Sequence, residues 1–150
     1  MKYVLWALQI LLGLAFLGAG FMKLSQPYAA LGEQMAWMGA VPEPLLRFIG
    51  LAEVLGGLGL ILPAATRIQP WLTPLAAAGL ALVMLLAALF HVARGELSLL
   101  APNIVLGLLA TFIAYGRRTL APILPRGQVA AASSAVGPAG STGAARVASA

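Results

Sequence analysis

Cysteine is absent from this 150-residue chain, and acidic side chains are scarce, with four Asp and Glu residues in total. The lack of cysteine excludes disulfides, thiolate metal sites, dithiol redox chemistry and a lipoprotein anchor. Any redox role must therefore use a bound cofactor or a partner. The single histidine and the few glutamates do not form a spaced ligand set, so we expect no metal site.

Charged residues make up only 9% of the chain, whereas hydrophobic residues make up 61% and the mean hydropathy is +0.97. This composition is far from that of a soluble domain and predicts a protein whose solvent is the lipid bilayer. The net charge of +5 could suit nucleic acid, but the basic residues are dispersed at the ends of apolar segments without interleaved aromatics. We therefore expect no nucleic-acid partner.

Four apolar stretches are each long enough to cross about 30 Å of hydrocarbon as a helix, at about residues 4–22, 45–63, 71–93 and 97–115. They predict an all-α fold, an integral membrane four-helix bundle formed by a single domain over residues 1–118. The first stretch could instead be a signal peptide, because Lys2 precedes it and small residues close it. Its length and the lysine behind it, Lys23, favour a membrane span.

Proline positions agree with these limits. Pro42 and Pro44 precede the second stretch, and we expect Pro63 to end it. Pro102 falls early in the fourth stretch, where we expect it to occupy the first turn of the helix.

The segment between the first two stretches is too polar to cross the membrane. Within it Leu31, Met35 and Met38 recur at helical spacing, which indicates a short helix over about residues 28–40 lying along the membrane interface. A plain connector is the alternative. Residues 119–150 are rich in Ala, Gly and Ser, a composition that predicts a disordered cytoplasmic tail.

Basic residues set the predicted orientation. One side of the four spans has five basic residues, Lys2, Arg67, Arg117, Arg118 and Arg126, and the other side has three, Lys23, Arg47 and Arg94. The side with five basic residues should be cytoplasmic. Both termini then face the cytoplasm, as an even number of spans requires.

Small and polar residues form one stripe along each predicted helix. In the first helix the stripe steps by four, three, four and three residues, through Gln9, Gly13, Phe16, Gly20 and Lys23. Such faces let neighbouring backbones approach closely, so six glycines are predicted to pack helix against helix: Gly13, Gly20, Gly50, Gly56, Gly57 and Gly107.

Four polar residues are predicted to lie together in the outer half of the bundle: Lys23, Glu53, His91 and Asn103. Glu53 stands well inside an apolar run, and an intramembrane acid usually faces a bundle interior or a wet cavity. A carboxylate near a lysine or an imidazole can hold or relay a proton. Each residue also has a structural interpretation: Lys23 can extend its amine to the interface, and Asn103 can join two helices by a hydrogen bond.

Four short segments of the chain form a set: Phe21 with Lys23 and Leu24, the Gly50-x-x-Glu53-x-x-Gly56-Gly57 pattern ending in Leu-Pro63, His91 with Gly95-Glu96, and Ala114-Tyr-Gly-Arg117. With these segments, roughly residues 4–118 resemble the DoxX-like family. The resemblance implies a small four-helix protein of the bacterial inner membrane, and relatives include the membrane subunit of a thiosulfate:quinone oxidoreductase. Most members have no established activity, and the absence of cysteine here excludes direct thiol chemistry.

Two functions stay open. The first is a quinone-associated subunit or accessory of a membrane oxidoreductase system, with Glu53, Lys23 and His91 around the headgroup of the quinone. The second is a non-enzymatic scaffold or assembly factor for a partner protein. No nucleotide motif, flavin fingerprint or haem ligand pair is visible, which argues against an autonomous oxidoreductase. A transporter fits less well, because neither inverted repeats nor broken helices are apparent.

Overall fold

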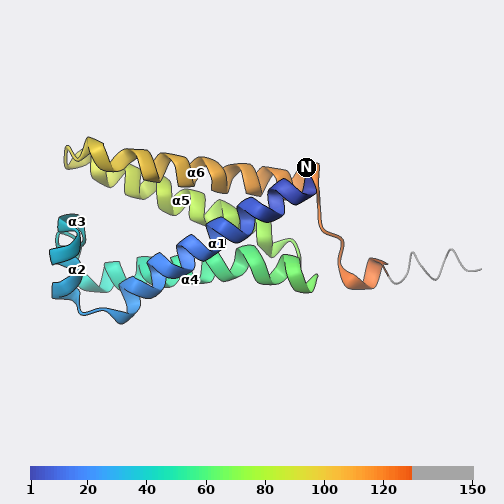
Figure 1. The fold of residues 1–150 in the computed structure, drawn as a ribbon, viewed down its shortest axis with the longest axis horizontal. Helices are drawn as coiled ribbons and strands as arrows, with labels where there is room; N and C mark the ends of the chain where they lie inside the picture. The colour runs from blue at the N-terminus through green and yellow to red at the C-terminus, as the bar shows by residue number, and fades with distance from the viewer. Residues whose placement is uncertain (130–150) are drawn as a thin grey trace, which may run out of the picture.

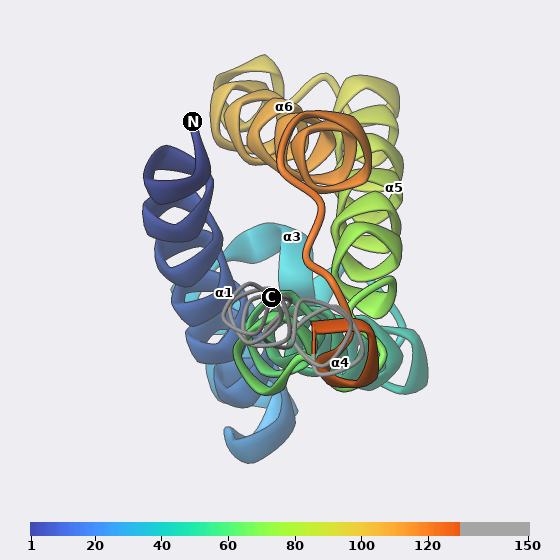
Figure 2. The same cartoon turned by 90° about the vertical axis from the view of Figure 1, so that its right-hand side faces the viewer.

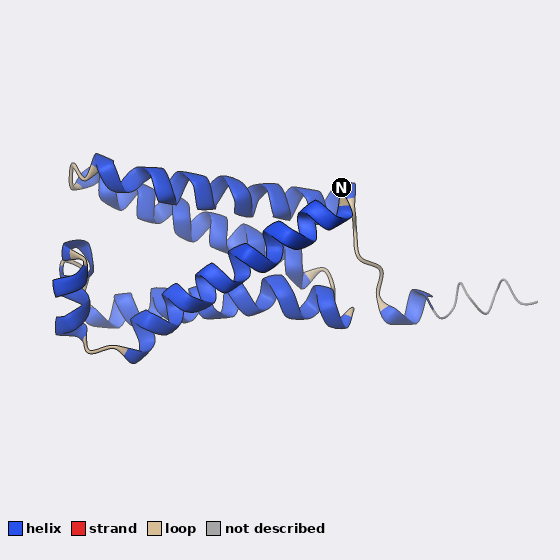
Figure 3. Ribbon diagram, viewed as in Figure 1, coloured by secondary structure: helices blue, strands red, loops and turns tan. Residues whose placement is uncertain are grey.

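A computed structural model describes residues 1–129, and within that range all regular structure is helical (Figure 1, Figure 3). Four helical segments are long and apolar enough to cross a membrane, which confirms the predicted all-α membrane bundle. The first three are α1 (Lys2–Ser25), α4 (Glu43–Thr66) and α5 (Leu72–Ala93). The fourth, Leu97–Leu120, combines the 3-10 turn η1 (Leu97–Leu99), α6 (Leu100–Tyr115) and the π-helical turn η2 (Gly116–Leu120).

Two prolines lie at the starts of helices as expected, whereas the proline expected to end a helix does not end it. Pro42 is the N-cap of α4, and Pro102 lies in the first turn of α6, as predicted. The expectation that Pro63 ends the second span is wrong, because α4 runs through it to Thr66. A proline removes only one hydrogen bond near the end of a membrane helix, where few turns remain. The helix ends instead at Arg67, whose φ of 57° is the left-handed conformation of a C-cap.

The four long helices surround a common centre. Viewed along the bundle, α1 and α5 stand on opposite sides, with α4 and α6 on the other two (Figure 2). α1 packs mainly on α4, and α5 packs mainly on α6. The turn between α5 and η1 contains Gly95 at φ 72°, a backbone conformation that a side chain would strain.

Glycines let α1 and α4 approach at two levels. A Cβ added to Gly20 would lie 2.5 Å from the carbonyl oxygen of Gly50, and one added to Gly57 would lie 2.7 Å from that of Gly13. In both places the obstacle is backbone, which cannot rotate away. The predicted small-residue stripes on these two helices therefore form their mutual contact.

The remaining glycines of the predicted set also face neighbours within the chain. A Cβ on Gly56 would meet the side chain of Leu80, and one on Gly107 would lie 3.3 Å from the Cβ of Met84. Both neighbours belong to the apolar core between α4, α5 and α6. That core is completed by α1 and consists of Leu12, Phe16, Leu60, Ala77, Leu80, Met84, Ala110 and Ile113.

Two short helices cross one end of the bundle, at the end away from the N-terminus (Figure 1). They are α2 (Tyr28–Gln34) and α3 (Ala36–Gly39), so the single helix expected over residues 28–40 is broken at Met35, which is extended. The break turns α3 back on α2, and the Tyr28 hydroxyl donates a hydrogen bond to the carbonyl oxygen of Val41 at 2.7 Å. A second apolar cluster forms beneath them, from Leu31, Met38, Val41 and Leu46.

Part of the predicted tail lies within the described range. Residues 119 and 120 belong to η2, and the backbone N–H of Arg126 donates to the carbonyl oxygen of Arg67 at 3.4 Å. Residues 130–150, the rest of the segment predicted to be disordered, lie outside the described residues.

Candidate functional site

A cavity of about 510 Å³, called the central cavity below, lies between the four long helices at the end covered by α3. All four residues of the predicted polar site, Lys23, Glu53, His91 and Asn103, contribute to its lining. The rest of the lining is mostly apolar and comes from all four spans, from Trp37 of α3 and from the α3–α4 connection. The four side chains come from four different helices: α1, α4, α5 and α6.

Lys23 and Glu53 form a buried ion pair in this cavity. The Lys23 Nζ lies 2.7 Å from Glu53 Oε2, and the two side chains are 6% and 5% exposed. An isolated charge at the centre of a bilayer costs about 2.5–3.5 kcal/mol on insertion scales, so each group offsets the cost of the other.

Trp37 of α3 lies between this pair and the histidine. The Lys23 Nζ is 5.9 Å from the centroid of the Trp37 ring, within the range of a cation–π contact. The ring of His91 meets Trp37 edge-on, with centroids 5.6 Å apart. Trp37 was not among the predicted site residues, and its only sequence signal was an aromatic side chain in the segment between the first two spans.

His91 is oriented by the turn that follows α5. Its Nδ1 lies 2.7 Å from Glu96 Oε2, and the Nε of Arg94 donates to the other oxygen of the same carboxylate at 2.8 Å. The hydrogen bond from His91, and then the one from Arg94, holds the pKa of Glu96 below its ordinary value of 4.5. An ionised carboxylate only accepts hydrogen bonds, so opposite it the Nδ1 of His91 acts as the donor.

Asn103 lines the same cavity but stands apart from these contacts. Its Nδ2 donates to the carbonyl oxygen of Leu99, one turn earlier in the same helical span, at 3.0 Å. The expected hydrogen bond between two helices is therefore not made by this donor.

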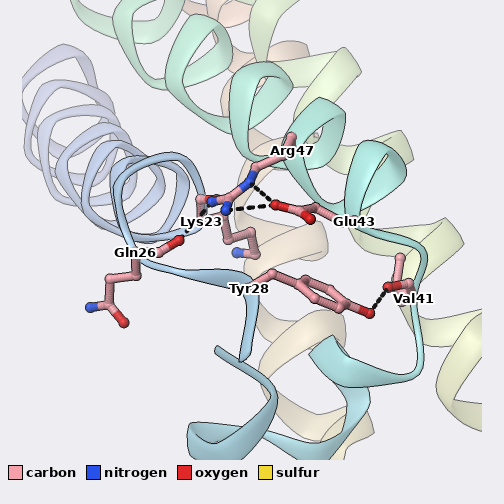
Figure 4. A network of polar contacts seen from close by, with 6 residues as sticks. All are labelled: Lys23, Gln26, Tyr28, Val41, Glu43 and Arg47. Atoms are coloured by element: carbon pink, nitrogen blue, oxygen red, sulfur yellow. Dashed lines mark hydrogen bonds and ion pairs between the residues drawn. The ribbon is translucent and has the colours of Figure 1, made fainter. Parts of the chain in front are cut away.

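Arg47 of α4 fixes the backbone at the end of α1 (Figure 4). Its Nη1 donates to the carbonyl oxygens of Lys23 and Gln26, the latter at 2.9 Å, and its Nη2 lies 3.0 Å from Glu43 Oε1. The last carbonyls of a helix have no partner within it, so this guanidinium caps α1 from outside. In the sequence, Arg47 was used only in the count of basic residues on each side of the membrane. Its position near the start of the second span is what allows its side chain to reach the end of α1.

The lining of the central cavity reaches the outer surface of the bundle. Three large side chains of its lining are exposed on the outer surface of the bundle: Leu45 and Phe48 of α4, and Leu86 of α5. In a membrane these side chains face lipid, so part of the cavity lining lies next to the hydrocarbon of the bilayer.

A second polar cluster lies at the other end of the bundle and was not predicted as a site. Gln9 of α1 donates from Nε2 to the carbonyl oxygen of Leu60, and its Oε1 accepts a hydrogen bond of 2.8 Å from the Nε of Arg117. In the sequence, Arg117 was considered as a charge at the end of the fourth span and as part of the Ala114-Tyr-Gly-Arg117 segment, without a partner inside the bundle. The signal that could have found this contact is Gln9 itself, a polar residue in an apolar helix face that needs a partner.

Comparison with known families agrees with the arrangement of the spans. The sequence model of the DoxX-like family matches residues 7–113. The chain belongs to the DoxX-like family. The match begins in α1 and ends in α6, and so includes every residue that lines the central cavity of this DoxX-like protein. No curated protein and no solved structure matches the chain.

Within the described part of the chain, no group of three or more His, Cys, Asp or Glu side chains is close enough to hold a metal ion. The acid–base groups of the central cavity are instead arranged in hydrogen-bonded couples.

Proposed function

We propose that this DoxX-like protein binds a quinone in the central cavity and acts as a quinone-associated subunit or accessory of a membrane oxidoreductase system. The observation that carries this proposal is the combination of a lipid-accessible apolar cavity with the buried Lys23–Glu53 pair in its wall. A ligand suited to this cavity dissolves in the bilayer and carries a polar headgroup that accepts hydrogen bonds.

The dimensions of the cavity support such a ligand. Ligand pockets usually enclose about 300–1,000 Å³, are mainly apolar and contain a few placed polar groups, and the central cavity measures about 510 Å³. Its mouth between Leu45, Phe48 and Leu86 offers a route for an apolar tail into the bilayer.

The chemistry of the polar groups supports the same assignment. A quinone supplies two-electron redox chemistry, and its reduction consumes two protons. Lys23 can donate a hydrogen bond to a headgroup carbonyl, while Glu53 and the Nε2 of His91 can accept and return protons. The chain has no cysteine, so the electrons would come from a bound cofactor or a partner protein.

The decisive experiment is extraction of the protein with native lipids, followed by mass analysis of what co-purifies, for the wild type and for Glu53→Gln. Glutamine keeps the size and much of the hydrogen bonding but cannot exchange a proton or balance the lysine charge. We expect wild type to retain a quinone, and Glu53→Gln to fold but lose it. Glu43→Gln is the matched control, because Glu43 lies on the same helix outside the cavity lining and its side chain is 50% exposed. Equal quinone retention by all three proteins would refute the proposal.

A non-enzymatic scaffold or assembly factor is the alternative. A scaffold needs a surface that holds a partner protein. The glycine faces of the spans are occupied by contacts within the chain, so this alternative would use the α2–α3 segment. A stoichiometric protein that co-purifies without any small molecule would favour this alternative over quinone binding.

We also propose that the protein lies in the inner membrane of a bacterium with both termini in the cytoplasm. The uneven distribution of basic residues supports this orientation. The central cavity would then lie in the outer half of the membrane.

A further inference from the structure

At the end of the bundle opposite the central cavity, Arg117 is buried among neutral partners. The residue is 5% exposed. Its Nε donates to Gln9 Oε1 at 2.8 Å, its Nη1 lies 3.5 Å from the carbonyl oxygen of Ala121, and its guanidinium carbon lies 5.1 Å from the centroid of the Trp6 ring. Its Nη2 is buried without a hydrogen-bond partner in residues 1–129. A guanidinium in this position has an unused donor and an unbalanced charge.

No carboxylate side chain of the protein is positioned to balance that charge. The sequence has four acidic residues, and all of them lie in α2, in the first half of α4 or beside the α5–η1 turn: Glu33, Glu43, Glu53 and Glu96. Among residues 1–129, the charged side chains at the opposite end of the bundle are all basic. An anion from outside the chain would therefore offset a cost that the protein's own acidic side chains leave in place.

The structure also provides space for such an anion. Arg117 and its neighbour Arg118 line a second cavity of about 430 Å³, between the α4–α5 connection and the segment after η2. The other lining residues are Gln69, Pro70, Trp71, Pro74, Pro122, Ile123 and Pro125. Two neighbouring arginines thus line a cavity whose other walls are largely apolar.

We propose that Arg117 and Arg118 bind a phosphate group in this second cavity. Guanidinium forks match the geometry of phosphate oxygens and bind them through paired, charge-assisted hydrogen bonds. The cavity lies at the end of the membrane spans, the depth at which lipid headgroups carry phosphate, and basic pockets between spans are suited to anionic headgroups. The same chemistry would accept free inorganic phosphate. This site is independent of the ligand proposed for the central cavity.

The test uses the full chain, extensively delipidated in detergent, and measures the midpoint of thermal unfolding with four probes. Dioleoyl phosphatidylglycerol is compared with dioleoylglycerol, which has the same acyl chains without phosphate. Sodium phosphate is compared with sodium chloride at equal ionic strength. A higher midpoint with dioleoyl phosphatidylglycerol than with dioleoylglycerol assigns a lipid headgroup, and a higher midpoint with sodium phosphate than with sodium chloride assigns free phosphate. If neither phosphate-bearing probe raises the midpoint above that of its phosphate-free counterpart, the proposal is overturned.

Variants separate this site from general charge attraction. We expect Arg118→Gln to need about tenfold more of the effective probe, as loss of a charge-assisted hydrogen bond predicts. Arg117→Lys keeps the charge but lacks the guanidinium fork, so we expect it to lose the response. Arg126→Gln removes one charge from the same end but is exposed and outside the cavity lining, so it should respond as wild type does. If Arg117→Lys does not fold, Arg118→Gln decides the matter: a response equal to that of Arg126→Gln overturns the proposal.

Discussion

Replacement of Gly20 by alanine tests whether α1 and α4 touch through their backbones. The new Cβ would lie 2.5 Å from the carbonyl oxygen of Gly50 and 2.9 Å from the backbone nitrogen of Val54. Neither atom can move without displacing α4 as a whole. Overpacking of this kind costs about 1–3 kcal/mol, and a rigid backbone obstacle favours the upper part of that range.

Gly18→Ala is the matched control on the same helix. A Cβ at Gly18 meets nothing within 4 Å, so this substitution changes only the intrinsic helix preference. Alanine is favoured over glycine in a helix interior by about 0.8–1.0 kcal/mol. Since both variants gain this term, the difference between them isolates the contact with α4, and we expect Gly20→Ala to be less stable than Gly18→Ala by about 1–3 kcal/mol.

The measurement is reversible unfolding in mixed micelles, followed by circular dichroism as the fraction of denaturing detergent rises. The free energy of unfolding is compared for wild type, Gly18→Ala and Gly20→Ala under one set of conditions. If Gly20→Ala proves as stable as Gly18→Ala, then α1 and α4 do not approach as closely as described, and the reasoning from the glycine stripes fails.

Three further outcomes are expected. Arg47→Ala leaves the carbonyl oxygen of Lys23 without its hydrogen bond and should lower the free energy of unfolding by about 1–3 kcal/mol. Glu43→Gln breaks only the exposed i,i+4 pair and should lower it by about 0.3–0.5 kcal/mol. Equal losses for the two variants in detergent unfolding would contradict the capping role of Arg47. Because the pKa of Glu96 is lowered in the folded protein, its stabilisation is complete above the ordinary value of 4.5 and is lost as the pH falls through the lowered value. The difference in melting temperature between wild type and Glu96→Gln should therefore close in acid, and a gap that is independent of pH would exclude this linkage. A cytoplasm-active reporter fused after Arg126 should be functional and a periplasm-active one should not, and the reverse result would invert the proposed topology.

The spans and their inward faces could be predicted because membrane helices follow simple rules. Apolar length fixes the number of spans, and a period of 3.6 residues fixes which side chains share a face. Lys23, Glu53, His91 and Asn103 were grouped by depth and helical phase alone, and all four line one cavity. What these rules cannot give is pairing: that Glu53 bonds Lys23 and not His91 depends on how the helices cross.

Other features depend on contacts between residues far apart in the chain. Arg117 is buried because Gln9, 108 residues away, accepts its hydrogen bond, whereas its sequence context is that of an ordinary interfacial charge. The break at Met35 has no glycine or proline to mark it. Pro63 shows the opposite case, a strong local signal that did not end the helix. Local patterns thus located the helices, while tertiary contacts decided where each one bends and ends.

The exposure of Leu45, Phe48 and Leu86 in the lining of the central cavity bears on which concentration would govern binding of the proposed quinone. A molecule that arrives through the bilayer is counted as a mole fraction among lipids, and its concentration in the aqueous phase has little bearing on binding. Added detergent increases the amount of the apolar phase and so lowers the mole fraction of the molecule in it. The same site, with the same affinity, can therefore be filled in a native membrane and empty after repeated washing in micelles.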